Sequence, residues 1–142
     1  MDMRQITEDY AVSPQITPDD VVTLAERGFA RVICNRPDSE VSGEETSAAI
    51  AAACERAGLE FAYVPVDHGG LSHNLIAAHR DAVEADGKAF AYCRSGTRST
   101  HIWALGQAGR MPVQDILEAG ARGGYDLSSL EPTLVSLARS EA

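Results

Sequence analysis

The sequence predicts a single α/β domain with a mainly parallel central sheet flanked by helices. Three short apolar runs, rich in β-branched or aromatic residues, are typical of buried strands: Ala30–Cys34, Phe61–Val66 and Ala89–Cys93. Stretches with helical spacing of apolar residues separate these runs and follow the last one. A β-α-β-α-β-α order favours a parallel sheet with right-handed crossovers. We assign the whole chain, residues 1–142, to this domain.

Capping residues indicate where the predicted helices begin. Thr17 precedes Pro18 and two acidic residues, which is an N-cap followed by proline at the first helical position. A weaker pattern at Tyr10–Ser13 indicates an opening strand. The expected helices run from Thr17 to Gly28, from Ser42–Glu45 to Gly58, from Ser72 to Gly87, around Ile102–Gly109, from Pro112 to Gly120 and from about Ser128 to Arg139.

The charge balance narrows the class of partner. The chain has 12 Lys and Arg residues against 21 Asp and Glu residues, a net charge of −9, which argues against nucleic acid or an anionic membrane as the main partner. No stretch approaches the roughly 20 apolar residues of a membrane span, and the first residues lack the apolar core of a secretory signal. Three cysteines without paired spacing indicate neither a disulfide framework nor a metal knuckle. We therefore expect a cytoplasmic protein without metal or cofactor.

Three loops should meet at one edge of the sheet. Ligands of parallel sheets bind outside the carboxyl ends of the strands. The loops that follow the three predicted strands are Asn35–Asp38, Asp67–Gly70 and Arg94–Arg98. We expect the functional site at this edge.

The third loop has the composition of an anion cradle beside a thiolate. It runs from Cys93 directly into a helix, so that successive backbone N–H groups and the positive helix end point inward. Gly96 permits a turn that a Cβ would hinder. The same field and Arg98 should stabilise the Cys93 thiolate as a nucleophile, with Ser99 or Thr100 donating to the sulfur. We expect this cradle to bind substrate through Arg94, Ser95, Gly96, Thr97 and Ser99.

These residues resemble known families. The run from Tyr92 to Ser99 resembles the active-site loop of rhodanese-type sulfurtransferases and, more loosely, of cysteine-dependent phosphatases. The wider pattern resembles the bacterial beta-lactamase-hydrolase-like protein, phosphatase-like domain family. The resemblance implies a protein-tyrosine-phosphatase-like fold, and members occur alone or fused to domains of the persulfide dioxygenase kind, a candidate partner. The motifs that carry it are Ser13–Pro18, Asn35–Asp38, Val64–Val66 with Gly69–Gly70, the cysteine loop and Gly124–Leu127.

The spacing within the loop favours sulfur transfer. Cysteine-dependent phosphatases have C-x5-R, whereas Arg98 follows Cys93 as C-x4-R, the count of rhodaneses. A shorter cradle has fewer N–H groups and less room for phosphate. The first expectation is therefore a sulfurtransferase that carries sulfur from thiosulfate or glutathione persulfide as a Cys93 persulfide. The alternatives are a phosphatase that acts on a phosphate ester through a Cys93 thiophosphate, and a non-catalytic anion-binding or redox-sensing module.

Five other residues have weaker signals. Asp67 follows the middle strand, where it is either a general acid or a turn residue. His68, beside it, is an acid in place of Asp67, a ligand, or without a role. Arg36 either widens the positive basin or pairs with Asp38 to brace the cysteine loop. Cys34 either packs in the core or resolves an oxidised Cys93, and His79 is expected to be a satisfied core residue.

Overall fold

The central sheet has five strands in the order β1-β2-β5-β3-β4, and the computed structural model describes residues 1–67 and 69–141. Only β1 runs antiparallel to its neighbour; the other pairs are parallel. This architecture confirms the predicted fold class. The strands are β1 Arg4–Thr7, β2 Tyr10–Ser13, β3 Phe29–Cys34, β4 Glu60–Tyr63 and β5 Lys88–Tyr92.

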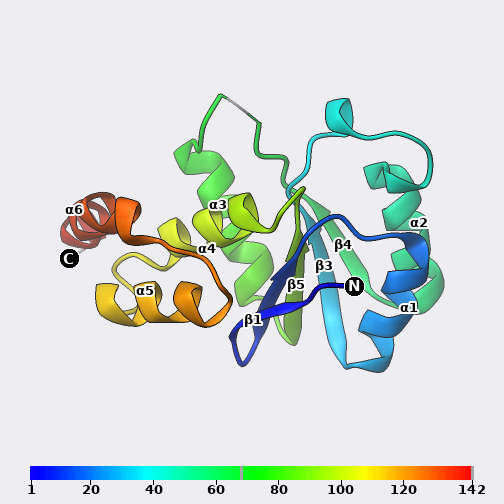
Figure 1. Cartoon of the computed structure of the whole chain (residues 1–142), viewed down its shortest axis with the longest axis horizontal. Helices are drawn as coiled ribbons and strands as arrows, with labels where there is room; N and C mark the ends of the chain where they lie inside the picture. Colours follow the sequence, from blue (N-terminus) through cyan, green and yellow to red (C-terminus); the bar gives the residue numbers. More distant parts are fainter. Residues whose placement is uncertain (68, 142) are drawn as a thin grey trace.

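Helices cover both faces of this sheet (Figure 1). Helices α1 and α2 lie on one face, and α3, α4, α5 and α6 lie on the other. Two short 3-10 turns, η1 Asp38–Glu40 and η2 Gly43–Glu45, lead into α2, and a third, η3 Ser128–Leu130, precedes α6. The helices are α1 Pro18–Glu26, α2 Ser47–Ala57, α3 His73–Glu84, α4 Thr97–Gln107, α5 Val113–Arg122 and α6 Glu131–Glu141.

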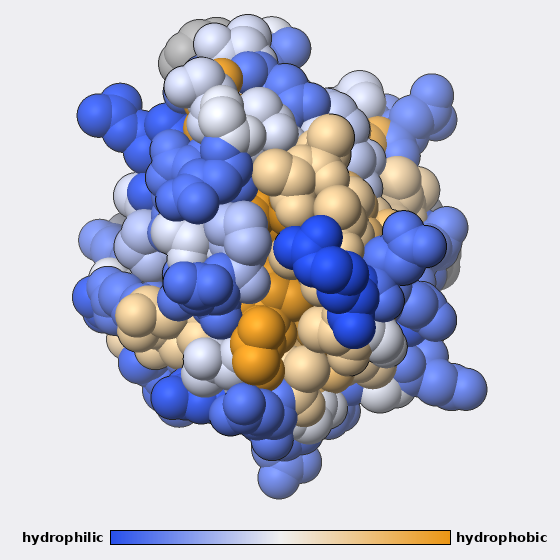
Figure 2. Space-filling model, turned by 90° about the vertical axis from the view of Figure 1, so that its right-hand side faces the viewer, coloured by the Kyte–Doolittle hydropathy of each residue, from blue (hydrophilic) through white to orange (hydrophobic). Residues whose placement is uncertain are grey.

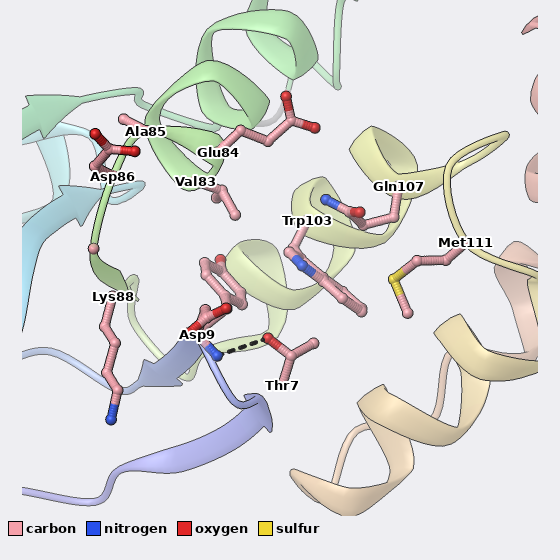
Figure 3. A pocket seen from close by; sticks show the side chains of 12 residues that line it. Thr7, Asp9, Val83, Glu84, Ala85, Asp86, Lys88, Trp103, Gln107 and Met111 are labelled. Atoms are coloured by element: carbon pink, nitrogen blue, oxygen red, sulfur yellow. Dashed lines mark hydrogen bonds between the residues drawn. The ribbon is translucent and has the colours of Figure 1, made fainter.

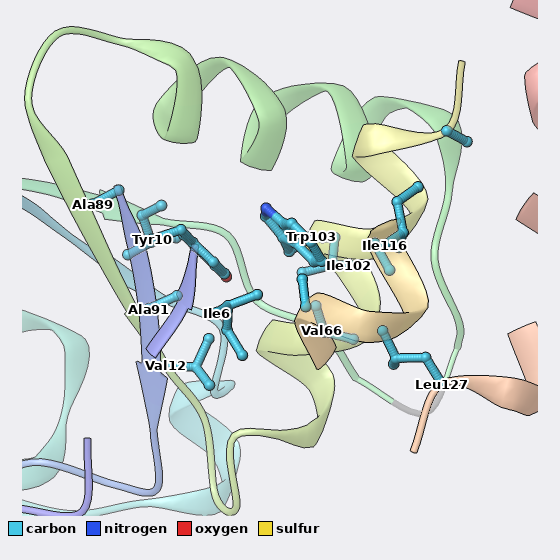
Figure 4. Packing of buried hydrophobic residues seen from close by; sticks show 14 of the residues in the cluster. Ile6, Tyr10, Val12, Val66, Ala89, Ala91, Ile102, Trp103, Ile116 and Leu127 are labelled. Carbon is cyan, nitrogen blue, oxygen red and sulfur yellow. The ribbon is translucent and has the colours of Figure 1, made fainter. Parts of the chain in front are cut away.

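The two faces bury separate apolar clusters. Beneath α1 and α2, the core includes Val21, Ile50 and Phe90. On the other face, Trp103 of α4 stacks on Tyr10 of β2, with ring centroids 5.9 Å apart (Figure 4). β5 contributes to both clusters because it is buried on both faces, as predicted from its uniformly apolar sequence.

The outer surface of α1 and α2 carries a shallow apolar strip (Figure 2). A hollow of about 460 Å³ between the two helices is lined by Val22, Ala25, Ala53 and Ala57 among others. In the described residues no helix has the length and apolar character needed to cross a membrane.

The fold differs from the sequence predictions in three places. β1 was not predicted, because its four residues are largely exposed at the sheet edge and lack an apolar run. The second helix begins at Ser47, capped by Thr46, because the two 3-10 turns occupy the segment where it was expected to open. β4 ends at Tyr63 and is exposed at both ends, so Phe61–Val66 is not a strand buried on both faces.

Candidate active site

The carboxyl ends of three strands lie side by side at the expected edge. Cys34 of β3 and Ser13 of β2 are both in register with Tyr92 of β5. The backbone N–H of Cys93 donates to the carbonyl oxygen of Ser13 at 3.4 Å, and that of Asn35 donates to Tyr92 at 2.9 Å. Cys93 therefore leaves the middle of the sheet with its backbone held from both sides.

The glycine of the cysteine loop is required by its conformation. Gly96 has φ +89° and is the N-cap of α4, as the sequence predicted for a turn that a Cβ would hinder. A Cβ built at Gly96 would also collide with Tyr125 Oη. That hydroxyl donates to the Ser95 carbonyl oxygen at 2.9 Å, so Tyr125 holds the outer side of the loop.

The Cys93 sulfur lies beneath this loop and is fully buried. The Gly96 N–H donates to Sγ at 3.0 Å. Neither predicted hydroxyl donor reaches the sulfur: Ser99 Oγ donates to Asn35 Oδ1 at 2.7 Å, and Thr100 Oγ1 donates to the Gly96 carbonyl oxygen at 2.8 Å. The expectation of a hydroxyl donor was therefore wrong, because each hydroxyl has a single proton and it is already engaged.

Arg98 is held in one orientation by Glu40 of η1. Nη1 donates to Glu40 Oε2 and Nη2 to Glu40 Oε1, each at 2.8 Å, and Nη1 also donates to the Val66 carbonyl oxygen at 2.8 Å. A guanidinium group has five N–H donors. The bonds to Glu40 and Val66 leave two of these donors, one on Nε and one on Nη2. They share an edge of the guanidinium plane and match two oxygens of an oxyanion.

The charges around Arg98 reinforce this arrangement. Hydrogen bonds from Arg98 hold the pKa of the Glu40 carboxyl below its usual value. The bond to Glu40 raises the pKa of Arg98, and negative charge at the nearby Cys93 sulfur would raise it further. The guanidinium therefore stays charged and lies within the electrostatic reach of the sulfur.

Arg36 reaches the same carboxylate rather than its predicted partner. Its Nε lies 3.4 Å from Glu40 Oε1, and its Nη1 donates to Gln15 at 3.1 Å. Asp38 instead accepts hydrogen bonds from the backbone N–H and hydroxyl of Ser47, at 2.7 and 2.6 Å, and these lower its pKa. The Arg36–Asp38 pair, one of the two expected roles of Arg36, was thus wrong, because Asp38 binds Ser47 at the start of α2.

An open hollow of about 590 Å³ lies above the loop. Five residues predicted for the site line it together with Glu40. They are Arg36, Arg94, Ser95, Thr97 and Arg98. Three arginines against one glutamate make this hollow electropositive in a chain whose net charge is −9, which favours an anionic ligand.

Asp67 is exposed and is not among the described residues that line this hollow. It follows Val66, whose carbonyl oxygen binds Arg98, and its own Oδ1 accepts the Gly69 N–H at 2.7 Å. The structure thus places the residue before Asp67 against Arg98, and the Asp67 side chain itself forms the turn that favours Asp at this position. His68 lies outside the described residues.

The other two cysteines are buried in the apolar cluster under α1 and α2. The Cys34 thiol donates to the Arg36 carbonyl oxygen at 3.3 Å, and burial raises its pKa. Burial raises the pKa of Cys54 to about 11. Both environments favour the protonated thiol, and within the described residues neither cysteine has a loop N–H group on its sulfur as Cys93 has from Gly96.

A second hollow, of about 500 Å³, lies at the opposite ends of the strands (Figure 3). Its lining includes Asp9, Asp86, Lys88 and Trp103, and it contains none of the predicted site residues. Within the described residues, no group of three or more His, Cys, Asp and Glu side chains is arranged to hold a metal ion.

The fold and the cysteine loop define a class, the phosphatase-like proteins with a protein-tyrosine-phosphatase-like fold. A candidate phosphatase of Neisseria meningitidis superposes with a TM-score of 0.81 at 30% identity, over 96% of this chain and 99% of that one. PTPMT1, solved in complex with PI(5)P, shares the fold with a TM-score of 0.72 at 17% identity, over 99% of both chains.

The family follows from the sequence comparison. The family model described as "Beta-lactamase hydrolase-like protein, phosphatase-like domain" matches residues 2–110, and the chain belongs to this family, which confirms the resemblance seen in the sequence. Beta-lactamase hydrolase-like proteins of Xylella fastidiosa (strain Temecula1) and Agrobacterium fabrum are 33% and 32% identical over 130 and 126 residues. These matches cover 89% and 87% of this chain but only 30% and 29% of the relatives' length.

Proposed function

We propose that the chain is a cysteine-dependent phosphatase that hydrolyses phosphate monoesters. The observation that carries the proposal is the Nε and Nη2 edge of Arg98, which Glu40 and Val66 leave unused near the buried Cys93 sulfur. This edge can bind two phosphate oxygens while the loop N–H groups bind others. The likeness to the Neisseria candidate phosphatase over nearly the whole of both chains supports the same reading.

The chemistry proceeds in two displacements. The Cys93 thiolate attacks phosphorus, the bond from phosphorus to the ester oxygen breaks, and protonated Asp67 gives that oxygen its proton. A thiophosphate on Cys93 results. Water then attacks phosphorus and gives a proton to the Asp67 carboxylate; the P–S bond breaks, and inorganic phosphate leaves with the thiolate restored. Arg98 stabilises the charge on the transferred group in both steps.

A small-molecule phosphate ester is the substrate class we propose. The hollow above the loop is lined by charged and hydroxyl side chains, which suits a polar anionic molecule. The structure of PTPMT1 with PI(5)P provides an example of such a ligand on this fold.

Sulfur transfer remains the second candidate because of the C-x4-R spacing. The thiolate would attack the outer sulfur of thiosulfate, the S–S bond would break and sulfite would leave; a thiol or cyanide would then remove the sulfur from the Cys93 persulfide. The comparisons support a phosphatase better than this reading, which the sequence had favoured.

One comparison of activities separates the candidates. The purified chain is given p-nitrophenyl phosphate in one arm, and thiosulfate or glutathione persulfide in the other, followed by intact mass spectrometry. Turnover of the ester, abolished in Cys93→Ser and kept in Cys54→Ala, supports the phosphatase. A gain of one sulfur atom on Cys93 without ester turnover supports the sulfurtransferase. If neither ester turnover nor a gain of sulfur is observed, the non-catalytic anion-binding module is the reading that is left.

The role of Asp67 is tested by the leaving group. Asp67→Asn should lower kcat by about 100-fold for an alkyl phosphate, whose leaving oxygen needs a proton. The same variant should change kcat much less for p-nitrophenyl phosphate, because nitrophenolate leaves without one. Asp126→Asn, a change at a carboxylate that accepts only from Ser128 in the structure, is the matched control. Equal loss with both substrates would remove Asp67 from this role.

A further inference from the structure

Four fully buried polar side chains form a connected group beneath the cysteine loop. They come from four different parts of the chain: Tyr10 from β2, Asn35 from the turn after β3, His79 from α3 and Ser99 from the first turn of α4. Tyr10 Oη donates to the Ser99 carbonyl oxygen at 2.9 Å and lies 3.0 Å from His79 Nε2. Asn35 Nδ2 lies 3.2 Å from His79 Nδ1.

The protons in this group have one consistent placement. The single hydroxyl proton of Tyr10 is used by the Ser99 carbonyl, so His79 Nε2 must be the donor to Tyr10 Oη. His79 Nδ1 is then the acceptor of an Asn35 amide proton. Burial lowers the pKa of His79 to about 3, so the ring is neutral, and the contacts place its one proton on Nε2.

The Asn35 amide is oriented by these contacts. Its second Nδ2 proton goes to the Val64 carbonyl oxygen at 2.9 Å, and its Oδ1 accepts from Ser99 Oγ at 2.7 Å. A flipped amide would place Oδ1 against the carbonyl of Val64 and the acceptor nitrogen of His79. The ring of His79 therefore selects one orientation of Asn35.

Asn35 joins the three segments that make the site. Its backbone N–H binds Tyr92, the residue before Cys93, and its backbone carbonyl accepts from Val66, the residue before Asp67. Its side chain binds Ser99, the residue after Arg98. Each of the three expected catalytic residues is thus one residue away from a hydrogen bond to Asn35.

We propose that Asn35 is a positioning residue that sets Cys93, Arg98 and Asp67 relative to one another, and that neutral His79 holds its amide in the working orientation. This inference rests on the proposed function for the meaning of the site. Asn35 and His79 do not touch the reacting atoms. They act through Ser99, Tyr92 and Val66.

The chemistry of the group favours positioning over mere core filling. Paired polar groups in a protein interior can often be replaced together by apolar groups of the same shape at little cost in stability. A fully satisfied polar network, in contrast, allows one arrangement of its members. The elements tied here are those whose relative placement decides the reaction geometry, where a displacement of about 1 Å costs roughly 100-fold in rate.

The test compares variants that have lost similar stability. Asn35→Ala removes the side-chain link, Ser99→Ala removes only its bond to Oδ1, and Val21→Ala is the matched control, a truncation in the cluster on the other face. All are assayed at a temperature where each is folded by circular dichroism. We expect kcat/KM for p-nitrophenyl phosphate to fall by about 30-fold or more in Asn35→Ala and by about 3- to 10-fold in Ser99→Ala, with Val21→Ala within twofold of wild type.

Two readouts keep the inference separate from the proposed function. The rate of Cys93 alkylation by iodoacetamide, with and without inorganic phosphate, is measured in every variant and should change by about tenfold in Asn35→Ala even if no ester is hydrolysed. If the wild type hydrolyses no ester, the proposed phosphatase activity is wrong, but the rates of Cys93 alkylation still test the role of Asn35. Should Asn35→Ala fail to fold, Ser99→Ala carries the comparison.

The spectroscopic signature is the tautomer of His79. Nitrogen-15 NMR of labelled histidine should show Nε2 protonated and Nδ1 unprotonated at neutral pH in the wild type. A proton on Nδ1, or unchanged kcat/KM and alkylation in Asn35→Ala and Ser99→Ala, would overturn the positioning role.

Discussion

Glu40 binds Arg98 through both carboxylate oxygens, with 2.8 Å from each oxygen to a different guanidinium nitrogen. The glutamate comes from the 3-10 turn after β3, and the arginine from the first turn of α4, 58 residues away. The pair uses the guanidinium edge formed by Nη1 and Nη2 and leaves the edge formed by Nε and Nη2 for another partner. The direction in which Arg98 presents its remaining donors is therefore set from outside the cysteine loop.

Glu40→Gln should weaken catalysis while Arg98 remains charged. The amide has one acceptor oxygen in place of two, so one guanidinium nitrogen loses its partner and the plane is free to turn. We expect kcat/KM for p-nitrophenyl phosphate to fall by about 10- to 100-fold, in line with a small misplacement of a binding group. Glu44→Gln, at an exposed residue of η2, is the control. Identical kinetics for the two variants would mean that the clamp does not orient Arg98.

Arg98→Lys should be nearly as harmful as Arg98→Ala. An ammonium group has no planar edge with two parallel N–H donors and cannot keep the contacts to both Glu40 oxygens and Val66. Steady-state kinetics of both variants, beside Arg56→Lys on the exposed side of α2, give the comparison. A mild effect of lysine would show that Arg98 supplies positive charge alone.

Gly96→Ala should destabilise the protein more than Gly28→Ala. Both glycines have nearly the same backbone, φ +89° and +87°, but a Cβ at Gly28 would meet nothing within 4 Å, whereas one at Gly96 would meet Tyr125 Oη. The strain of positive φ, about 1–2 kcal/mol, is common to both, and the excess at Gly96 measures crowding. Urea denaturation gives both free energies of unfolding.

The Tyr125→Phe background identifies the source of that excess. Removing the hydroxyl takes away the nearest colliding atom, so Gly96→Ala should cost less there than in the wild type. Equal costs in the two backgrounds would contradict the collision.

The free energy of unfolding should rise with pH between about 4.5 and 6.5. The pKa of His79 is lowered to about 3 in the folded protein, against about 6.5 when unfolded, so the unfolded chain binds the extra proton in this range. The contribution of neutral His79 to the free energy of unfolding is fully present above about pH 6.5. It is lost at up to about 1.4 kcal/mol per pH unit as the pH falls below that value. His101, whose pKa burial also lowers, adds in the same direction.

The acidic groups act in a lower range, which allows the two effects to be separated. Because the pKa of Glu40 is lowered in the folded protein, its ionised carboxylate stabilises the fold. This contribution is lost only as the pH falls below about 4.3, the pKa of a glutamate in an unfolded chain. Urea midpoints of wild type and His79→Leu across pH 4.5–7 should differ in slope. Parallel curves would mean that His79 does not contribute.

Periodicity and capping were enough to predict most of the fold. The apolar runs that end at Cys34 and Cys93 are strands because they lie inside the sheet, and such strands have few polar residues. β1 gave no comparable signal, since an exposed edge strand such as Arg4–Thr7 needs no apolar run. Edge position also explains why β4 is less buried than its sequence indicated.

The cysteine loop could be predicted because its residues are contiguous in the sequence. The residues that surround it come from distant segments, so the sequence alone could not identify them. Glu40 has no local signal that distinguishes it from neighbouring acids, and only the fold brings it to Arg98. The same holds for Tyr125, which reaches Ser95 from a distant segment. His79 was predicted to be a satisfied core residue, which its two ring contacts confirm, but its partners Tyr10 and Asn35 depend on the tertiary structure.

The strand order has a consequence for how the chain folds. β5, which delivers Cys93, is the last strand in the sequence, yet it lies between β2 and β3. During synthesis the segment before β5 can form the β1–β2 hairpin and three helices, but β2 and β3 have no common neighbour until residues 88–92 emerge from the ribosome. Closing the sheet and delivering the nucleophile are therefore one event, and a half-folded chain has no assembled site in which Cys93 could react.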